Sequence, residues 1–257
     1  MKYLLRVRNK VRRIFMKQLI DWGMKPETSD ELNYYLQKKD LKVGRKTFFF
    51  DAKSTFVDVQ RPWMLEIGSY CKIARGTIIL QHDYSRSVLR RYYGQILCEA
   101  GKTVIGDNVF IGMNSIILMG THIGNNVIIG AGSVVKDNIP ENVVAAGNPA
   151  KIVCTLEEYY KKRVHEQLNE AFICVKEYLK FYGKYPTVKE MGAFFHLYMK
   201  RDISELEREG LFLDWHGDEK EEILESFMNT EPLFQDYSGF LKYCDERIRN
   251  DTANSGK

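Results

Sequence analysis

A six-residue repeat in the middle of the chain limits the possible folds more than any other sequence feature. From Ile105 the chain reads IGDNVF, IGMNSI, ILMGTH, IGNNVI, IGAGSV and VKDNIP without a break in register. A helix repeats its apolar face about every 3.6 residues and a strand about every two, so neither element alone explains the period. Short repeated units of this kind are typical of a solenoid, in which each coil covers the apolar side of its neighbour.

Three positions of the hexad have distinct physical roles. The first position is always aliphatic, which predicts a column of stacked side chains inside the solenoid. The fifth position is mostly small or β-branched, which suits an inward-facing site of limited width. The fourth position holds Gly or Asn, residues that tolerate positive φ, and so predicts a corner in each hexad. The predicted corner residues are Asn108, Asn114, Gly120, Asn126, Gly132 and Asn138.

The same phase extends toward the N-terminus. Ile67, Ile73 and Ile79 occupy first positions, and Gly76 occupies a corner. From residue 43 to residue 63 the pattern changes to an aromatic-rich alternation, which we interpret as an irregular first coil. An all-β solenoid domain is therefore predicted over residues 40–153.

His82 occupies the fourth, corner position of the hexad that begins at Ile79, and the register breaks immediately afterwards. Residues 85–102 do not fit the hexads and are predicted to form a loop extruded from a corner. Loops held by a rigid scaffold are where functional residues concentrate. An imidazole with an ordinary pKa near 6.5 suits a general base at neutral pH. The alternative is that His82 is only a turn residue with positive φ.

The hexads and the segment that closes them resemble a known family. The runs IGAGSVV, NIPEN and AAGNPAK are similar to the closing signature of the hexapeptide-repeat acyltransferases, in particular the maltose, galactoside, xenobiotic and capsular-polysaccharide O-acetyltransferases. The resemblance implies a left-handed parallel β-helix with a C-terminal α-helical appendage in this chain. It also implies a homotrimer with acetyl-CoA bound between neighbouring subunits.

The resemblance further implies a direct reaction at His82. This residue would take the proton from a hydroxyl of a sugar or cell-surface polysaccharide precursor, which then attacks the thioester without a covalent enzyme intermediate or a metal. Asp83, Tyr84 and Ser85 are expected to orient His82 or to bind the acceptor, although ordinary turn chemistry would also place such residues there. The identity of the acceptor and the length of the acyl group stay open.

Six residues match positions at which the family binds acetyl-CoA. The match implies an aromatic beside the thioester arm, main-chain contacts along the pantetheine and cations near the nucleotide phosphates. Lys136 stands one place away from the lysine of the family's V-T-K-D pattern. In the order of those roles the residues are Phe110, Gly112 and Met113, Ala131, and finally Lys136 and Lys151.

The γ-class carbonic anhydrases share this solenoid and bind zinc through three histidines, so a zinc site of that type is an alternative. Only His82 and His122 lie within the predicted coil, so no metal is expected and His122 is interpreted as a surface residue. The five cysteines are odd in number and contain no C-x-x-C pair, which favours a reducing cytoplasm over a disulfide framework.

The N-terminal segment, residues 1–39, is predicted to be basic and helical. Its first twenty residues contain seven Lys or Arg and no acid, with dispersed apolar residues and no continuous signal-peptide core. Such a helix can contact an anionic membrane surface peripherally, or it can cap the first coil of the fold. The overall net charge of +4 does not indicate a nucleic-acid partner.

Residues 154–257 are predicted to form a helical region whose role the sequence does not define. Thr155 and Glu158 form a capping box that opens a long helix, which Gly183 ends. Thr187 and Glu190 form a second capping box, which predicts a second helix to about residue 200. Further helices are predicted over 218–228 and 233–249, followed by a disordered polar tail over 251–257.

Two functions compete on this sequence. The first is an acetyl-CoA-dependent O-acetyltransferase, and the second is a non-enzymatic solenoid scaffold that binds proteins. His82 distinguishes them, because a scaffold has no use for an imidazole at that corner.

Overall fold

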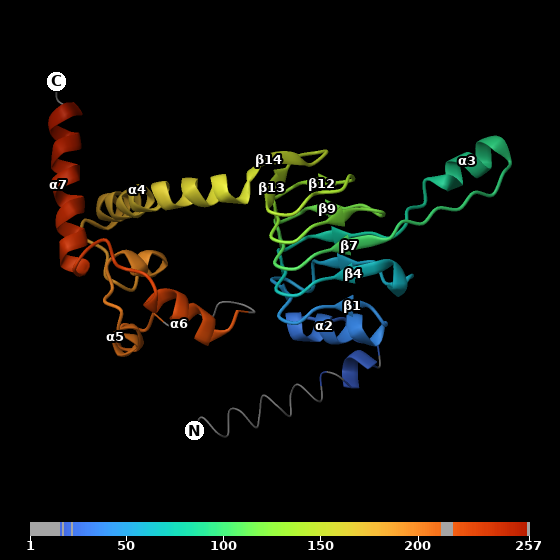
Figure 1. The fold of residues 1–257 in the computed structure, drawn as a ribbon, viewed down its shortest axis with the longest axis horizontal. Helices are drawn as coiled ribbons and strands as arrows, with labels where there is room; N and C mark the ends of the chain where they lie inside the picture. Colours follow the sequence, from blue (N-terminus) through green and yellow to red (C-terminus); the bar gives the residue numbers. More distant parts are fainter. Residues whose placement is uncertain (1–15, 17, 22, 212–217, 256–257) are drawn as a thin grey trace. The chain divides into compact units, whose positions relative to one another are not determined.

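A computed structural model describes residues 16, 18–21, 23–211 and 218–255, and the expected basic helix of the first twenty residues lies largely outside them. The chain divides into two compact units, Met1–Tyr159 and Tyr160–Lys257. Figure 1 shows that the first unit is a coil of short strands and that the second is helical.

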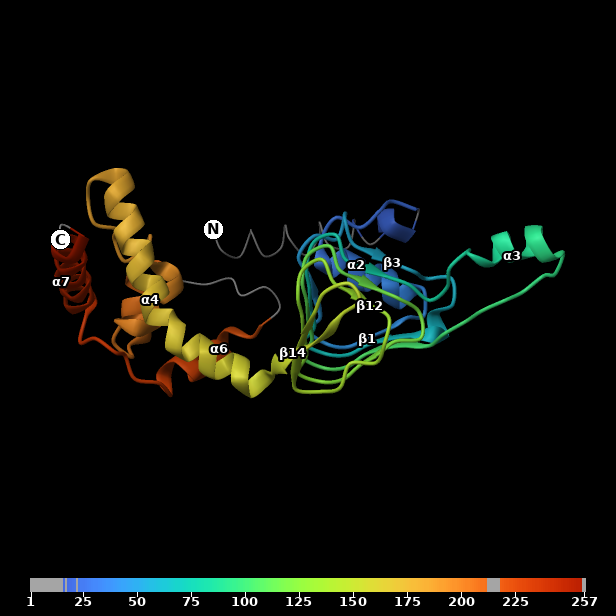
Figure 2. The same cartoon turned by 90° about the horizontal axis from the view of Figure 1, so that it is seen from above.

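The coil is built from three stacks of parallel strands that form the faces of a prism (Figures 1 and 2). Neighbouring coils pair in register, so that Ile73, Ile111 and Ile129 lie above one another. Sheet A comprises β1 (Lys42–Val43), β4 (Leu65–Ile67), β7 (Thr103–Ile105) and β10 (His122–Ile123). Sheet C comprises β3 (Phe56–Val57), β6 (Ile78–Ile79), β9 (Ile116–Ile117) and β12 (Val134–Val135).

Sheet B is the longest face and closes the coil. Its final strand pairs antiparallel with the strand before it, which ends the parallel stacking. With the hexad period, this architecture confirms the expected left-handed parallel β-helix with a C-terminal helical appendage. Sheet B comprises β2 (Phe48–Phe49), β5 (Lys72–Ile73), β8 (Phe110–Ile111), β11 (Ile128–Ile129), β13 (Val143–Ala146) and β14 (Lys151–Thr155).

The interior of the coil is the predicted column of aliphatic side chains. All six first-position residues from Ile105 to Val135 are at most 1% exposed. The fifth-position residues are buried as well, and their hydroxyls donate to nearby carbonyls, as Thr121 does to the oxygen of Leu118 at 2.9 Å. The hydroxyls at the fifth positions are therefore satisfied within the coil.

The predicted corners are present at five of the six positions, where φ lies between 55° and 79°. Asn138 is the exception: its side-chain oxygen instead accepts the backbone N–H of His122, and the positive φ falls at Asn142. Amide side chains also link successive corners, because Asn108 donates to Asn126 at 2.9 Å and Asn126 donates to Asn142 at 3.0 Å.

Helix α2 (Ser29–Lys38) covers the first coil. A capping box between Thr28 and Glu31 opens it, and Leu32 and Leu36 are buried in the same apolar cluster as Phe49 of the coil. The open end of the aliphatic column is thereby closed by this helix.

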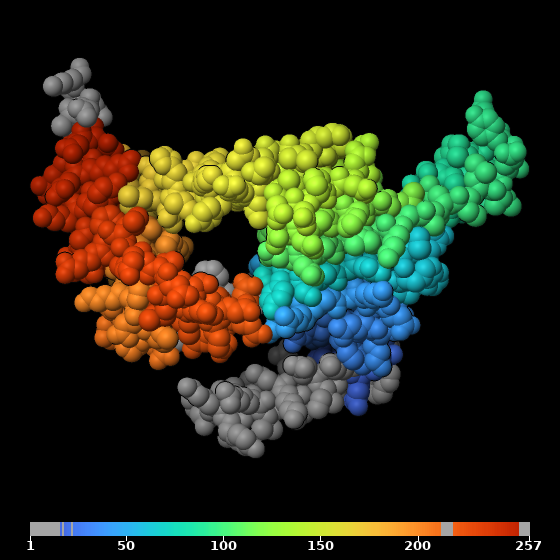
Figure 3. All heavy atoms as spheres, in the orientation of Figure 1, coloured from blue at the N-terminus to red at the C-terminus, as the bar shows by residue number. Residues whose placement is uncertain are grey.

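Between His82 and β7 the chain leaves the coil as an arm that is prominent in Figures 1 and 2, and the space-filling view of Figure 3 shows this arm projecting from the coil. The arm carries helix α3 (Arg86–Tyr93), which the sequence did not predict, and Gly94 ends this helix with φ of 76°. Helix α3 contains no buried residue. The short helix η1 (Pro62–Met64) lies in the irregular first coil.

The second unit has its own core and begins with the predicted capping box. Thr155 and Glu158 exchange hydrogen bonds of 2.8–3.1 Å, and α4 (Leu156–Tyr182) follows. Phe172 and Val175 of α4 are buried, whereas Tyr160 is exposed. The other helices are η2 (Gly192–Leu197), α5 (Ile203–Arg208), α6 (Lys220–Met228) and α7 (Tyr237–Ser255).

Two sequence predictions for this unit were wrong. The predicted hydrogen bond between Thr187 and Glu190 forms, but only the 3-10 helix η2 follows it. Phe195 and the successive residues 197–199 are all buried. An α-helix with one buried face cannot bury consecutive positions, so this segment does not form one. The expected disordered tail over 251–257 was wrong for residues 251–255, since α7 continues to Ser255 and Lys176 pairs with Asp251 at 2.8 Å; residues 256 and 257 lie outside the described part of the chain.

The corner geometry predicts an unusual order of stability at Asn126. We expect Asn126→Gly to be more stable than Asn126→Ala by about 1 kcal/mol, because both lose the amide contacts but only Ala must hold a left-handed φ. Urea unfolding monitored by circular dichroism measures the difference. Equal stability, or a more stable Ala variant, would contradict the corner assignment.

Candidate active site

The histidine predicted from the register break is held by a buried carboxylate. Nδ1 of His82 lies 2.5 Å from Oδ2 of Asp58, and the side chains of His82 and Asp58 are 22% and 2% exposed. A carboxylate in this role only accepts, so the shared proton is assigned to Nδ1 of the imidazole. Nε2 then carries the free lone pair, which is the arrangement a general base requires.

Asp58 reaches this position through the stacking of one coil on the next. Strand β3 pairs in parallel with β6, with Val57 opposite Ile79, so the residue after β3 lies beside the residues after β6. The Asp58 carboxylate also accepts the backbone N–H of Gln60 at 3.0 Å and that of Gln81 at 3.1 Å. A buried charge with three hydrogen-bond partners has a fixed position, and it fixes the imidazole in turn.

The interpretation of His82 as a positive-φ turn residue was wrong. Gly76 at the preceding corner of the same coil and Gly120 on the next coil have φ of 74° and 79°, but His82 is not among the residues with positive φ. The reason is that the chain leaves the coil at this corner instead of turning into the next face.

Asp83, Tyr84 and Ser85 follow His82 at the neck of the arm and are exposed. Asp83 accepts from the backbone N–H of Ser85 at 2.8 Å and from its hydroxyl at 2.7 Å. Hydrogen bonds from Ser85 lower the pKa of Asp83 to about 2. Asp83 therefore organises the neck, and the orienting role considered for these residues belongs to Asp58.

The C-terminal end of the arm is held by hydrogen bonds next to the corner at His82. The guanidinium of Arg61 donates to the main-chain oxygen of Glu99 at 2.9 Å, and the backbone N–H of Arg61 donates to Gln81 at 3.0 Å. Thr103, where the coil resumes, donates its hydroxyl to Leu80 at 3.0 Å. Both ends of the arm are thus held beside His82.

The residues expected to contact the thioester arm lie around sheet B. Phe110 of β8 and Met113 just after it are exposed. Gly112 packs so closely on the next coil that a Cβ atom there would lie 2.4 Å from the backbone nitrogen of Ala131, so only glycine fits. Phe110, Met113 and Ala131 are exposed around the edge between sheets B and C, whereas Gly112 is buried beneath them.

Lys136 and Lys151 are brought together although fifteen positions separate them in the sequence. Their ammonium groups lie 3.5 Å and 3.6 Å from the same carboxylate oxygen of Asp137. Two cations share one anion, which leaves a net positive charge suited to phosphate. The displaced position of Lys136 in the sequence therefore does not separate it from Lys151 in space.

One chain does not bring the predicted base and the predicted thioester contacts to one edge. His82 follows β6 of sheet C, where the chain continues toward sheet A, so it lies at the edge between these sheets. Met113 follows β8 of sheet B, where the chain continues toward sheet C, so it lies at a different edge. A complete site in one chain is not formed by these residues.

His122 is exposed at the start of β10, in agreement with its interpretation as a surface residue. Among the described residues no group of three or more His, Cys, Asp or Glu side chains could hold a metal ion. Within the same part of the chain no helix is both long and apolar enough to cross a membrane.

Asp58 is the functional residue that the sequence analysis missed. The available signal was an acid between two valines, Val57 and Val59, in a stretch where apolar and polar residues alternate. A buried carboxylate in such a position requires a partner. The irregular first coil hid that partner, because the hexad count does not extend back to residue 58 without a break.

Comparison with known proteins places the chain. The family model of bacterial transferase hexapeptide repeats (six repeats) matches residues 102–137. CapG of Staphylococcus aureus is 39% identical over 148 residues, which are 57% of this chain and 83% of CapG. YvoF of Bacillus subtilis (strain 168), provisionally named an acetyltransferase, is 34% identical over 48% of this chain and 64% of YvoF.

The chain is also similar to a solved structure, a maltose O-acetyltransferase from Clostridium difficile 630. The identity is 26%, covering 60% of this chain and 89% of that one, with a TM-score of 0.38. The assignment rests on the repeat model and on the extent of the CapG match. The chain belongs to the family of bacterial hexapeptide-repeat transferases and is an acetyltransferase.

Proposed function

We propose that the protein transfers the acetyl group of acetyl-CoA to a hydroxyl of a sugar or of a cell-surface polysaccharide precursor, with His82 as general base. The observation that carries this proposal is the 2.5 Å contact between Nδ1 of His82 and the buried Asp58. It gives the imidazole one defined tautomer, and the side chain of His82 stays partly exposed beside the neck of the arm.

In the proposed reaction, Nε2 of His82 takes the proton of the acceptor hydroxyl as the oxygen attacks the thioester carbonyl. Asp58 stabilises the imidazolium that forms, as a buried carboxylate does in other acyl-transfer sites. Collapse of the tetrahedral intermediate breaks the C–S bond, and the thiolate receives the proton from Nε2. The enzyme thus returns to its starting state without a covalent intermediate, and main-chain N–H groups stabilise the oxyanion.

Acetyl-CoA is assigned to the second group of residues. Ala131 is exposed, the close packing of Gly112 places Ala131 against the coil that carries Met113, and the exposed side chains of Phe110 and Met113 lie beside it. The cation pair of Lys136 and Lys151 is assigned to the nucleotide phosphates, which a point charge on a flexible stem can follow.

The separation of these two groups supports a homotrimer. If each prism presents its His82 edge to the Met113 edge of a neighbour, both groups meet between subunits. Because the contact is between different edges, it is heterologous, and three copies close it into a ring around a threefold axis. Each trimer then contains three equivalent sites.

The acceptor class rests on the neck of the arm. Asp83, Tyr84 and Ser85 follow His82 directly and resemble the form common among sugar and polysaccharide O-acetyltransferases. An exposed Tyr ring can lie on the apolar face of a sugar, and carboxylate and hydroxyl groups can bind its hydroxyls. The scaffold hypothesis is set aside because the chain belongs to a transferase family and its corner histidine has a buried partner.

We place the reaction in the cytoplasm. The cysteines of this chain form no disulfide among the described residues, and two of them, Cys71 and Cys244, are buried. Peripheral contact of the basic N-terminal segment with a membrane remains a proposal about residues outside the described part.

Loss of the base or of its partner tests the mechanism. We expect His82→Ala to lower kcat by about 10²- to 10⁴-fold, and Asp58→Asn to lower it by a comparable factor because an amide can stabilise the wrong tautomer. Both should leave the KM for acetyl-CoA nearly unchanged. Thiol release with a sugar acceptor measures the rates.

The matched control is Asp51→Asn, since Asp51 hydrogen-bonds within its own turn to Ser54. This variant should keep the normal kcat. Full turnover in His82→Ala, with the protein folded, would contradict the proposal.

The lysine assignment predicts an effect on binding alone. Lys151→Ala should raise the KM for acetyl-CoA by about two- to fivefold, the range expected for a solvent-exposed ion pair, with kcat retained. With acetyl-pantetheine, which lacks the nucleotide phosphates, the variant should match the parent protein. An equal increase in KM for both donors would refute the phosphate contact.

A further inference from the structure

A large cavity lies between helix α2 and the first coil, apart from the residues assigned above to acetyl-CoA. Its volume is about 1100 Å³, beyond the range of about 300–1000 Å³ usual for small-molecule pockets. Three segments line it: residues 20, 21 and 23–27, helix α2 with Lys39, and residues 52–60 around β3. All three belong to the first unit.

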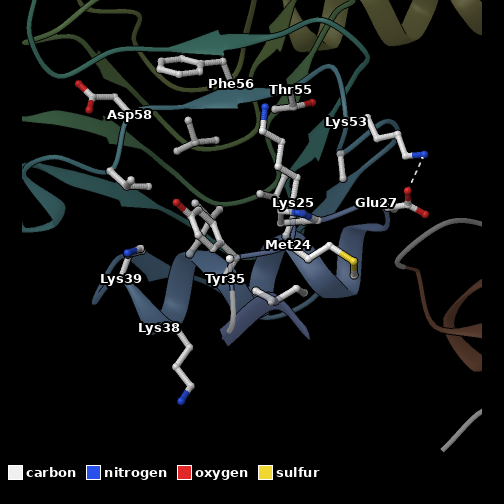
Figure 4. Close-up of a pocket in the computed structure, with 18 of the residues that line it drawn as sticks. Met24, Lys25, Glu27, Tyr35, Lys38, Lys39, Lys53, Thr55, Phe56 and Asp58 are labelled. Atoms are coloured by element: carbon white, nitrogen blue, oxygen red, sulfur yellow. Dashed lines mark ion pairs between the residues drawn. The ribbon is translucent and has the colours of Figure 1, made fainter. Parts of the chain in front are cut away.

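The walls of the cavity are mainly apolar. Leu32 and Leu36 of α2 face it from one side, with Val57 and the exposed Phe56 of β3 on the other. Figure 4 shows Tyr35 rising from α2 into the space below Phe56. Leu32, Leu36 and Val57 are buried, while Phe56 and Met24 expose apolar surface beside the hollow, which suits the binding of an apolar group.

Cations lie around these apolar walls. Of the four lining lysines, Lys53 pairs with Glu27 at 2.8 Å, and Lys38 lies 3.9 Å from Asp21 and points away from the cavity in Figure 4. Lys25 and Lys39 form no ion pair with any residue that the structure describes.

The third lining acid, Asp58, is engaged with His82. The lining thus carries four lysines against three acids, a net charge of about +1, and Lys25 and Lys39 are the lysines without an ion pair among the described residues. A phosphate group can accept from both lysines, and an alkyl or isoprenoid chain attached to it matches the apolar walls. A neutral apolar ligand would have no group to pair with the lysine ammonium groups, and a free sugar would have no apolar chain to contact the apolar walls.

We infer that this cavity binds a lipid phosphate, with its apolar chain between Tyr35 and Phe56 and its phosphate between Lys25 and Lys39. The cavity also touches the active site, because Asp58 lines its wall and holds His82. This inference rests on the proposed function, in which the bound lipid phosphate is the carrier end of the glycan acceptor. The sugar attached to it then lies toward the neck of the arm.

Calorimetric titration of the full-length protein with octyl phosphate, below its critical micelle concentration, tests this inference. We expect binding of one molecule per chain, with octanol and inorganic phosphate each at least about tenfold weaker. The double variant Lys25→Ala/Lys39→Ala should weaken the binding of octyl phosphate by about tenfold and leave the affinity for octanol unchanged. Phe56 is exposed, so Phe56→Ala carries little risk to folding. This variant should weaken the binding of octyl phosphate and of octanol by similar factors.

Lys42→Ala is the charge-matched control, because Lys42 is exposed, pairs with Glu66 and does not line the cavity. It should bind octyl phosphate normally. Absence of binding, equal affinity for inorganic phosphate, or binding that survives the double lysine variant would each overturn the inference.

The same preparations separate this inference from the proposed function. His82→Ala should bind octyl phosphate with unchanged affinity while losing acetyl transfer. Transfer to a free sugar without octyl phosphate binding overturns the lipid-phosphate site alone. Binding without any acetyl transfer in the parent protein overturns the proposed function alone.

Discussion

The structure depends on a single constraint, the burial of one aliphatic side chain per hexad in a continuous column. Each of these side chains is covered only by the coils on either side, so every coil must keep the same register as its neighbours. The corners with positive φ allow this register, and the amide contacts between Asn108, Asn126 and Asn142 reinforce one edge. Helix α2 and strand β14 close the two ends of the coil.

The same stacking produces the chemistry. Asp58 and His82 are distant in sequence, but the pairing of β3 with β6 places them one coil apart at the same edge. In the proposed reaction, the hydrogen bond to Asp58 orients the imidazole before substrate binds, which would lower the entropic part of the barrier. Where the chain departs from the repeat, at the arm and at the first coil, it gains the exposed groups and the cavity that a regular prism lacks.

The sequence predicted the regular part of the fold well and the irregular parts poorly, for a physical reason. A periodic column can be counted, so the buried first and fifth positions and five of the six corners were predicted correctly. Asn138 failed because the repeat is already ending there. Helix α3, the turn at η2 and the partner role of Asp58 depend on contacts between segments distant in sequence, which hexad counting does not contain.

The central claim is that His82 of one subunit acts on a thioester held by its neighbour, and mixed trimers test it most directly. His82→Ala removes the base, and Ala131→Trp blocks the exposed main chain assigned to pantetheine; each variant alone should be nearly inactive. Subunits mixed one to one and reassembled should recover about a quarter of the parent activity, because one site in each mixed trimer then combines two intact edges. If the mixture stays as inactive as its components while forming trimers, the site does not lie between subunits and the account is wrong.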